Sequence, residues 1–546
     1  MTRERISRVL IAILIGAFLL RVVGLQYGLP YRLVGDEESY VGGALKMLEL
    51  KTFIPAFAGP GFEPFYLPPV MYYALLPVFL AVLGVQYLTS GAGSLAVLRD
   101  SIALDPTWIW LSARVMSVFM GTVSVWLVYI IGRDLISSRA GLFAAALLAT
   151  SFMASSISHF ARHWVPALLV VLLALWASSR LLTASPGHSR RWYLWIGVFA
   201  GLGFGVNYVP MLALLLLFAA HLLKHGGTLW TKLRSRTLWA AVGIAAAIGV
   251  AIVLLHPNAF FRILVGEAGS FSVHKSASAF AGGLRYYGQA LIVYEPALVI
   301  FGLLGFGYLF FARRRIFWFL APFMLVYLAA LYLFFHDEVR YVLLLVPFLA
   351  LAGAAVLDWF WSRSPTFAFT LVVAALAFSG VTAARLDFLL LQDDTRLLAK
   401  AFVENNIPVG AAILTTVREV RLTPTRASLE AQALLDPASL RAPERALLRR
   451  PEDTWPTPRF ATFNAHFVAP EQRPAFEASQ FQYVLLQYRT PADLAEAFKA
   501  LRERSELVKS FIGSPDVLGN DITSPATLFS LKRLGPTMEL RVLKAL

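Results

Sequence analysis

The sequence predicts a polytopic α-helical membrane protein that carries a small α/β domain at its C-terminal end. Two observations predict the membrane part. Of the 546 residues, 58% are hydrophobic, and apolar runs of about 17–25 residues, the length that a helix needs to cross a bilayer, recur up to Arg385. The α/β domain is predicted because charged residues and proline replace the long apolar runs after that point. We therefore expect a membrane domain at residues 1–385 and an exterior domain at residues 386–546.

The net charge of +15 fits a membrane topology better than a nucleic-acid interface. Lys and Arg gather in short loops between apolar runs, where the positive-inside bias places them in the cytoplasm. We find no basic stripe interleaved with aromatic side chains, so we expect no nucleic-acid partner. The chain has no cysteine, which excludes disulfides, thiol catalysis and cysteine-type zinc sites.

The first apolar run, residues 6–25, follows three arginines and lacks a small-residue cleavage site. We interpret it as a retained span with a cytoplasmic N-terminus rather than a signal peptide. With this start, about eleven spans place every strongly basic short loop on the cytoplasmic side of a cell inner (plasma) membrane. The expected spans are residues 6–25, 108–132, 141–157, 165–182, two short helices within 192–223 that turn near Asn207, 238–256, 289–311, 316–335, 341–357 and 367–384.

One further apolar run, residues 66–88, is long enough to span but contains three prolines, which disfavour a regular helix. A span here would move two basic loops to the exterior, against the positive-inside bias. We therefore expect it within a long first exterior loop, residues 26–107, as a helix that lies in or dips into the outer leaflet.

The exterior domain is expected to combine strands and helices. Residues 411–416, 482–487 and 537–543 have strand character, and residues 490–503 have helical character because Thr490 and Pro491 suit a cap and a first turn. The proline-rich residues 437–458 indicate a loop.

The first candidate for chemistry is the acidic segment at residues 35–40, directly after the first span. Three adjacent carboxylates, Asp36, Glu37 and Glu38, repel each other at a membrane surface. One interpretation is a general base for an acceptor hydroxyl or a metal ligand. The alternative is an acidic first turn, with Asp36 as the cap of a helix that includes residues 41–50.

Two more polar clusters lie at exterior ends of expected spans. His159, Arg162 and His163 follow the third span, where they suit a phosphate or form an interfacial belt anchored by Trp164. Residues 336–341 separate two later spans. There Arg340 suits a bidentate phosphate contact, or is simply paired with the preceding carboxylates in a solvated hairpin.

A long exterior loop before residue 289 also carries polar residues, among which Lys275 is a weaker candidate for the substrate groove. All three main clusters fall on one face of the membrane. Together they predict one exterior site in which cations hold a phosphate leaving group and a carboxylate activates a nucleophile.

At this point the residues resemble a known family, the GT-C superfamily of integral-membrane glycosyltransferases, and within it the protein O-mannosyltransferase and aminoarabinose-transferase type. The similarity covers roughly residues 6–385. It rests on the order and sidedness of several segments: Gly35-Asp36-Glu37-Glu38-Ser39-Tyr40, Leu67-Pro68-Pro69-Val70-Met71-Tyr72-Tyr73, residues 114–142, His159-Phe160-Ala161-Arg162, and Arg340-Tyr341 followed by Pro347.

The resemblance implies an inverting transfer of a sugar from a polyprenyl-phosphate donor to an acceptor (a protein, lipid or polysaccharide) on the outer face. Asp36 would be the catalytic carboxylate and Glu37 would assist or position it. By this resemblance, Arg162 and Arg340 would be candidates to bind the carrier phosphate. To these two we add His163, Tyr341 and Lys275 as expected phosphate-binding residues.

This sequence departs from the family where many relatives have an Asp two positions after the arginine that matches Arg162, since Trp164 stands there. Asp36, Glu37 and His163 are conceivable ligands for a divalent metal, and metal dependence stays open. Two other functions also stay open: a transporter or flippase of a lipid-linked sugar, for which inverted repeats would be expected, and a non-catalytic scaffold.

Overall fold

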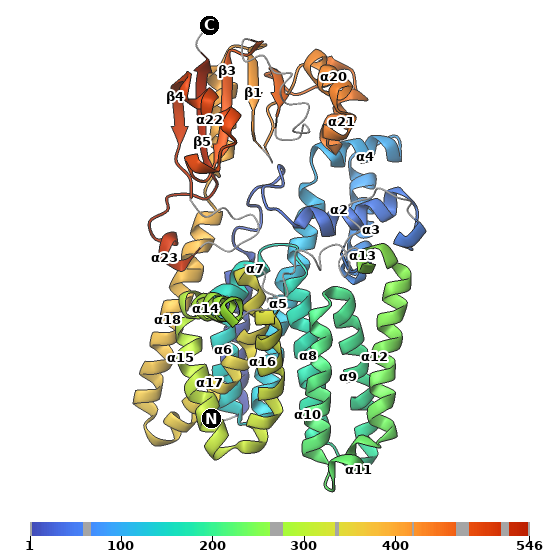
Figure 1. The fold of residues 1–546 in the computed structure, drawn as a ribbon, viewed down its shortest axis with the longest axis vertical. Helices are drawn as coiled ribbons and strands as arrows, with labels where there is room; N and C mark the ends of the chain where they lie inside the picture. The colour runs from blue at the N-terminus through green and yellow to red at the C-terminus, as the bar shows by residue number, and fades with distance from the viewer. Residues whose placement is uncertain are drawn as a thin grey trace.

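In the computed structural model, the chain forms a bundle of long helices with a five-stranded sheet at one end (Figure 1). The structure describes residues 3–57, 67–261, 277–333, 338–417, 420–465, 480–514 and 524–543. The helices before the sheet domain are α1 Arg3–Val22, α2 Glu37–Glu49, α3 Val70–Thr89, α4 Leu95–Leu104, α5 Thr107–Leu135, α6 Ser138–Thr150, α7 Phe152–Ser158, α8 Trp164–Thr183, α9 Pro186–Val206, α10 Leu214–Lys224, α11 Leu229–Leu233, α12 Arg236–Leu255, α13 Pro257–Phe261, α14 Ala277–Tyr294, α15 Pro296–Ala312, α16 Arg314–Leu333, α17 Val346–Arg363 and α18 Pro365–Leu390. Short 3-10 turns include η3 Val209–Ala213 and η5 Val339–Leu345.

The predicted membrane architecture is confirmed. Within the described residues, 7 helices are long and apolar enough to cross a membrane, or up to 9 if each of two bent pairs is one span. Helices occupy every range expected to span. Besides the two bent pairs, α1, α9 and α10 are not among the 7, and in α1 the reason is the arginines at its two ends. The 7 include α3, which was not expected to span. The turn expected near Asn207 is present, because Asn207 ends α9 and η3 follows it.

Two of the expected spans are bent rather than straight, which is a correction to the sequence prediction. The span expected at residues 141–157 is bent by 57° between α6 and α7, and the span expected at 289–311 is bent by 111° between α14 and α15. An apolar pattern does not reveal such breaks, since each half keeps its hydrophobic residues. Ser151 and Glu295 stand at the two breaks.

Close approach of helices packs the bundle. A methyl group placed on Gly305 of α15 would lie 1.9 Å from the carbonyl oxygen of Ala352 in α17. Likewise, one on Gly132 of α5 would lie 2.9 Å from the Cα of Gly141 in α6. Small residues at such contacts let membrane helices pack backbone against backbone.

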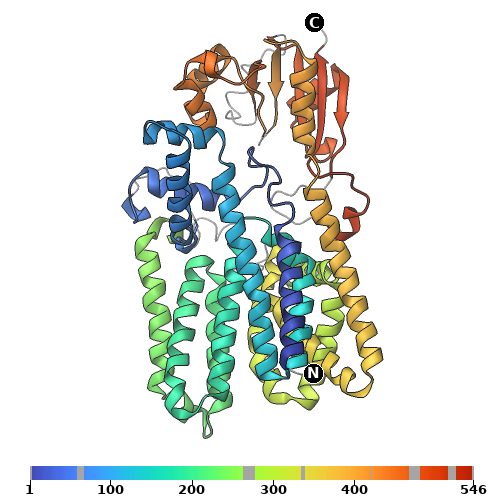
Figure 2. The same ribbon diagram turned by 180° about the vertical axis from the view of Figure 1, so that it is seen from behind.

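Residues 70–88 of the apolar run expected at 66–88 form most of α3, whose composition alone would suit a span. Figures 1 and 2 both place α3 beside α2 and α4, between the ends of α8, α9 and α12 and the sheet domain. One side of α3 is buried and consists of Met71, Tyr72, Leu75, Leu76 and Phe79. Leu80, Val85 and Leu88 of the same helix are exposed.

The sheet has the strand order β2-β1-β3-β5-β4, with β2, β1 and β3 parallel and β5 antiparallel to both β3 and β4. Its strands are β1 Ala412–Thr415, β2 Ala461–Asn464, β3 Tyr483–Tyr488, β4 Ser505–Phe511 and β5 Thr537–Leu543. The helices of this part are α19 Thr395–Asn406, α20 Arg426–Leu435, α21 Ala442–Leu448, α22 Glu496–Glu503 and α23 Pro525–Leu528.

The expected strands at 411–416, 482–487 and 537–543 are present as β1, β3 and β5. Two expectations here were wrong. The segment 437–458 is not simply a loop, because it contains α21, where the Glu444 side chain accepts the backbone N–H of Arg441. The helix expected at 490–503 is interrupted at Leu494, so that only α22 remains after a 3-10 turn.

The sheet domain and the helix bundle are joined by buried polar contacts. Tyr27, in the loop after α1, donates its hydroxyl to Asp394, which caps α19 and pairs with Arg396 at 2.8 Å. Leu33 of the same loop, only 1% exposed, packs into the hydrophobic cluster beneath the sheet. The loop that precedes the acidic segment is therefore held between the two parts of the chain.

Candidate active site

Asp36 occupies an unusual backbone conformation at the start of α2. Its φ is 66°, a left-handed value that costs a non-glycine residue on the order of 1–2 kcal/mol. Asp36 stands at the cap position of α2, yet its side chain makes no capping hydrogen bond. The carboxylate is turned instead toward Arg340, whose Nη1 lies 3.1 Å from Oδ2. Strain of this kind is typical of functional sites.

Arg340 comes from η5, which precedes α17 and lies about 300 residues after Asp36 in the sequence. It is 8% exposed and shares its guanidinium between Asp36 and Glu338. The described part of the expected hairpin thus forms the predicted ion pair with Glu338. In addition, Arg340 contacts Asp36 in the acidic segment of the expected first exterior loop. His336 and Asp337 of this cluster lie outside the described residues.

Glu37 has a different environment from Asp36 although the two are adjacent. It is fully buried, and Arg114 of α5 donates Nε to Oε1 at 2.9 Å and Nη2 to Oε2 at 2.6 Å. The backbone N–H of Ala161 also donates to Oε1, at 2.7 Å. Both oxygens of Glu37 are therefore engaged, which suits positioning of the loop and leaves it poorly placed to take a proton.

Glu38, the third carboxylate of the segment, faces the sheet domain. Arg441 donates to its Oε2 at 2.5 Å, and Arg32 donates to its Oε1 at 3.1 Å. Each of the three adjacent acids is thus bound to a different part of the chain. Asp36 is the one that forms an ion pair with Arg340, an arginine of a predicted phosphate-binding cluster.

Arg162 lies beside the acidic segment, as expected. It is 5% exposed, and its Nη2 donates to the carbonyl oxygen of Gly35 at 3.1 Å. Burial lowers the pKa of Arg162, and the nearby Asp36 carboxylate opposes that shift. A guanidinium held with so little water gains from a further anion, because its lost hydration has to be replaced.

His163 and His159 are less suited to bind a phosphate. The Nδ1 of His163 shares a hydrogen bond with the Tyr40 hydroxyl. Burial, with Arg340 and Arg162 nearby, holds the pKa of His163 well below its ordinary value, so the ring is neutral. His159 turns away toward α18, where its Nε2 lies 3.1 Å from Asp387.

The other predicted residues differ in how closely they lie to this cluster. Tyr341 packs edge-on against Trp164, with ring centroids 4.7 Å apart, and its carbonyl oxygen accepts the Tyr327 hydroxyl at 2.6 Å. Lys275 lies outside the described residues. In the part of the chain that the structure describes, no three His, Asp or Glu side chains are grouped to hold a metal ion.

The sequence interpretation missed the partners that orient the acidic segment. Arg114 lies within an apolar span, and a single arginine there gives no sign of its partner, although a charge inside a membrane span is itself a signal of function or pairing. Arg441 lies in the segment expected to be a loop. In the sequence, Arg114 and Arg441 were recognisable only as isolated charges, without their partners.

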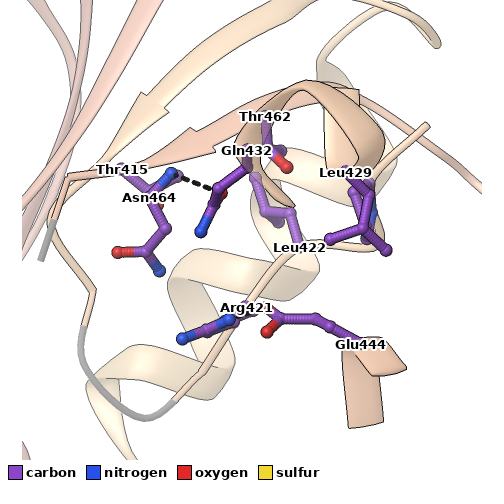
Figure 3. A pocket seen from close by; sticks show the side chains of 9 residues that line it. Thr415, Arg421, Leu422, Leu429, Gln432, Glu444, Thr462 and Asn464 are labelled. Carbon is purple, nitrogen blue, oxygen red and sulfur yellow. Dashed lines mark hydrogen bonds and ion pairs between the residues drawn. The ribbon is translucent and has the colours of Figure 1, made fainter. Parts of the chain in front are cut away.

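A pocket in the sheet domain lies at the carboxyl ends of the parallel strands β1 and β2 (Figure 3). Its lining includes Thr415, Gln432 and Asn464, with Arg421 and Glu444 drawn toward each other at one side. Because α21 carries both Arg441 and Glu444 at its start, this pocket adjoins the contact with Glu38.

Comparison with known proteins agrees with this architecture. The family model of dolichyl-phosphate-mannose-protein mannosyltransferases matches residues 109–256, a range that includes Arg114 and Arg162 but neither Asp36 nor Arg340. The solved structure of ArnT from Cupriavidus metallidurans bound to undecaprenyl phosphate has a TM-score of 0.54 at 12% identity, covering 99% of this chain and 98% of that chain. The chain has the GT-C fold.

A second solved structure supports the GT-C assignment. The oligosaccharyltransferase of Archaeoglobus fulgidus, tethered with an acceptor peptide, has a TM-score of 0.51 at 15% identity, covering 94% of this chain and 73% of that chain. No curated protein sequence matches the chain. The GT-C fold and the multi-pass membrane architecture predicted from the sequence are therefore confirmed.

Proposed function

We propose that the chain is a glycosyltransferase that moves a sugar from a polyprenyl-phosphate donor to an acceptor hydroxyl at the outer face of the membrane. The observation that carries the proposal is the ion pair between Asp36 and Arg340, with Arg162 bound to the adjacent Gly35. A carboxylate and two guanidinium groups at one membrane boundary are the groups that such a transfer needs. The relatives supply the class of donor, since ArnT was solved with undecaprenyl phosphate.

In the proposed reaction, the acceptor oxygen attacks the anomeric carbon and the bond from that carbon to the phosphate oxygen breaks. The acceptor proton passes to the Asp36 carboxylate. The electron pair leaves with the polyprenyl phosphate. Direct displacement from the opposite face inverts the anomeric centre.

Arg340 would connect substrate binding to the base. Its guanidinium is shared between Asp36 and Glu338, and a donor phosphate would compete for the same N–H groups. Binding of the donor would thus draw Arg340 from Asp36 and release the carboxylate for the acceptor proton. Arg162 would hold the second side of the phosphate, where charge grows as the sugar leaves.

The remaining predicted residues take supporting roles in this proposal. Glu37 would position the loop through Arg114 rather than exchange protons. His163, neutral and bonded to Tyr40, would shape the pocket rather than supply charge. Tyr341 would pack the site wall against Trp164, and Lys275 stays a candidate for the donor groove. We expect the cell inner membrane, with the sheet domain outside.

The test is complementation of a strain that lacks the protein, with mass spectrometry of its polyprenyl-linked sugars and glycans. Wild type should restore the missing product, and Asp36→Asn should leave the carrier-linked sugar to accumulate. Glu49→Gln is the control, because Glu49 lies at the exposed end of the same helix, where it pairs with Lys46 at 2.8 Å. Full complementation by Asp36→Asn at normal abundance would reject the proposal and favour a transporter.

A further inference from the structure

A single buried carboxylate joins the two helix breaks of the bundle. The Oε1 of Glu295, at the break between α14 and α15, accepts the Ser151 hydroxyl at 2.5 Å and the Met153 backbone N–H at 2.8 Å. Ser151 stands at the break between α6 and α7 and caps α7, since its Oγ accepts the N–H of Ala154 at 3.1 Å. Glu295 therefore fixes where α7 begins.

Glu295 has no part in the proposed reaction, yet it is fully buried. Within the described residues its Oε2 has no hydrogen-bond partner, and no Lys or Arg forms an ion pair with it. Burial of a carboxylate without an ion pair is unfavourable unless its hydrogen bonds compensate for the lost hydration. The two hydrogen bonds to the start of α7 provide that compensation.

The short helix α7 carries the loop that reaches the acidic segment. All of its residues are buried, and Ser155 donates its hydroxyl to the Leu20 carbonyl of α1 at 2.5 Å. The chain that follows α7 supplies the Ala161 N–H to Glu37 and the Arg162 guanidinium to Gly35. A shift of α7 would therefore displace both contacts.

On its other side, Glu295 ends the helix that packs against the Arg340 turn. α14 contacts η5, and Tyr294 next to Glu295 stacks on Phe152 of α7 with ring centroids 6.2 Å apart. Figure 1 shows α14 and α7 side by side at the level of the bundle's end nearest the sheet domain. Glu295 thus lies between the elements that carry Arg162 and Arg340.

We propose that Glu295 is a positioning residue that sets the spacing of Arg162 and Arg340 by joining α7 to the α14–α15 break. The hydrogen bonds to Oε1 hold the two breaks in register. The two guanidinium groups then face Asp36 and a bound phosphate at a fixed separation. The part of this inference that concerns phosphate rests on the proposed function.

Two measurements on the full-length protein in nanodiscs test the proposal: hydrogen exchange of peptides that cover residues 152–163, and affinity for undecaprenyl phosphate. Glu295→Ala should raise exchange there about tenfold and weaken the affinity about fivefold or more. Glu295→Gln keeps an oxygen that accepts both hydrogen bonds, so it should stay within about twofold of wild type in both measurements.

Glu539→Ala is a control for the loss of a buried glutamate in another part of the chain. Glu539 is a buried glutamate of the sheet domain that accepts the Tyr488 hydroxyl at 2.5 Å, far along the chain from α7. Its removal should leave exchange at 152–163 unchanged. Should Glu295→Ala fail to fold, Ser151→Ala removes one of the two hydrogen bonds with little loss of volume and should give an intermediate rise in exchange.

Three results would overturn the proposal: unchanged exchange in Glu295→Ala and Ser151→Ala, a Glu295→Gln variant as impaired as Glu295→Ala, or faster exchange with unchanged affinity. If wild type binds no undecaprenyl phosphate, the proposed function fails separately. The exchange measurement then still decides whether Glu295 holds α7.

Discussion

Arg340 and Asp36 form an ion pair of 3.1 Å between opposite ends of the helical part of the chain, and each is held from its other side. Asp36 is held by a left-handed backbone, and Arg340 by Glu338. Under the proposed function, this pairing keeps the proposed base and the proposed phosphate ligand oriented before the donor binds. Exchange of Arg340 from one anion to another then requires little movement.

Replacement of Arg340 should weaken binding of a polyprenyl phosphate more than it weakens the fold. A charge-assisted hydrogen bond contributes about 1.5–3 kcal/mol, so Arg340→Ala should lower the affinity for undecaprenyl phosphate about 10–100-fold. The affinity of Arg340→Lys should lie between those of wild type and Arg340→Ala, because an ammonium group binds one oxygen where the guanidinium binds two. Binding to the purified protein in nanodiscs measures this.

Arg313→Ala is a suitable control for that measurement. Arg313 is exposed and lies between α15 and α16, in a loop expected on the cytoplasmic face. Equal losses of affinity in the two variants would mean that net charge, rather than the Arg340 site, binds the phosphate.

Removal of Arg114 should act through folding rather than chemistry. Arg114 and Glu37 are both fully buried, and the guanidinium also donates to the carbonyl oxygens of Leu25 and Tyr27. Taking away one partner of a buried pair costs about 3–5 kcal/mol. Arg114→Met should therefore lower the thermal unfolding temperature sharply, whereas Asp36→Asn should change it little.

The double variant Arg114→Met with Glu37→Gln supplies the control for this prediction. It removes both charges, so part of the lost stability should return. A double variant less stable than Arg114→Met alone would argue that Glu37 is stabilised mainly by the Ala161 N–H and not by the ion pair.

The difference between Asp36 and Glu37 illustrates what the sequence could not predict. The acidic segment, Arg162 and Arg340 were recognisable because charges at the ends of apolar runs stand out, and the positive-inside bias put them on one face. The choice among three adjacent carboxylates depends on partners far along the chain. Arg114 and Glu295 lie inside apolar runs, where hydrophobic periodicity records the span and not the contact.

The C-terminal region was predictable at a coarser level. Strands β1 and β3 are mostly apolar and β5 alternates, so these three were expected, whereas β4 is largely exposed and β2 has two polar residues among its four. α21 escaped prediction because prolines surround it, although the Glu444 carboxylate accepts the Arg441 N–H at its start. Proline at the first turn of a helix is favourable, so a proline-rich stretch need not be a loop.

His163 should make the fold less stable in mild acid. Burial and two nearby arginines hold its folded-state pKa well below the ordinary 6.5. The unfolded chain therefore binds a proton as the pH falls through about 6.5 while the folded chain does not, and stability decreases by up to about 1.4 kcal/mol per pH unit. Above pH 7.5 this contribution is constant.

Thermal unfolding at pH 7.5 and pH 5.5 measures that effect. His163→Gln, which does not titrate, should lose less stability between the two pH values than wild type. Equal losses would show that His163 is charged in the folded protein, and would return it to the candidates for phosphate binding.

The contact between α4 and α21 should likewise weaken in acid, but in a lower pH range. Arg449 donates its Nη2 to Asp100 at 2.5 Å, and this hydrogen bond lowers the pKa of the Asp100 carboxyl below its ordinary 3.8. A depressed carboxyl pKa stabilises the folded state above pH 3.8. That contribution to stability is lost as the pH falls through the lowered pKa. Near neutral pH the contribution is therefore constant.

Arg449→Ala tests how far this contact holds the sheet domain on the first exterior loop, because it breaks the pair at every pH. The pair is partly exposed, so its loss should cost about 1 kcal/mol or less and leave the sheet folded. Combined with Arg441→Ala, which removes an ion pair between Glu38 and the same domain, it should raise protease cleavage in the segments that join α4 and α21 to the rest of the chain. Each single variant should show a smaller increase. If the double variant is cleaved no faster than wild type, then Tyr27, Asp394 and Leu33 alone are sufficient to hold the domain in place.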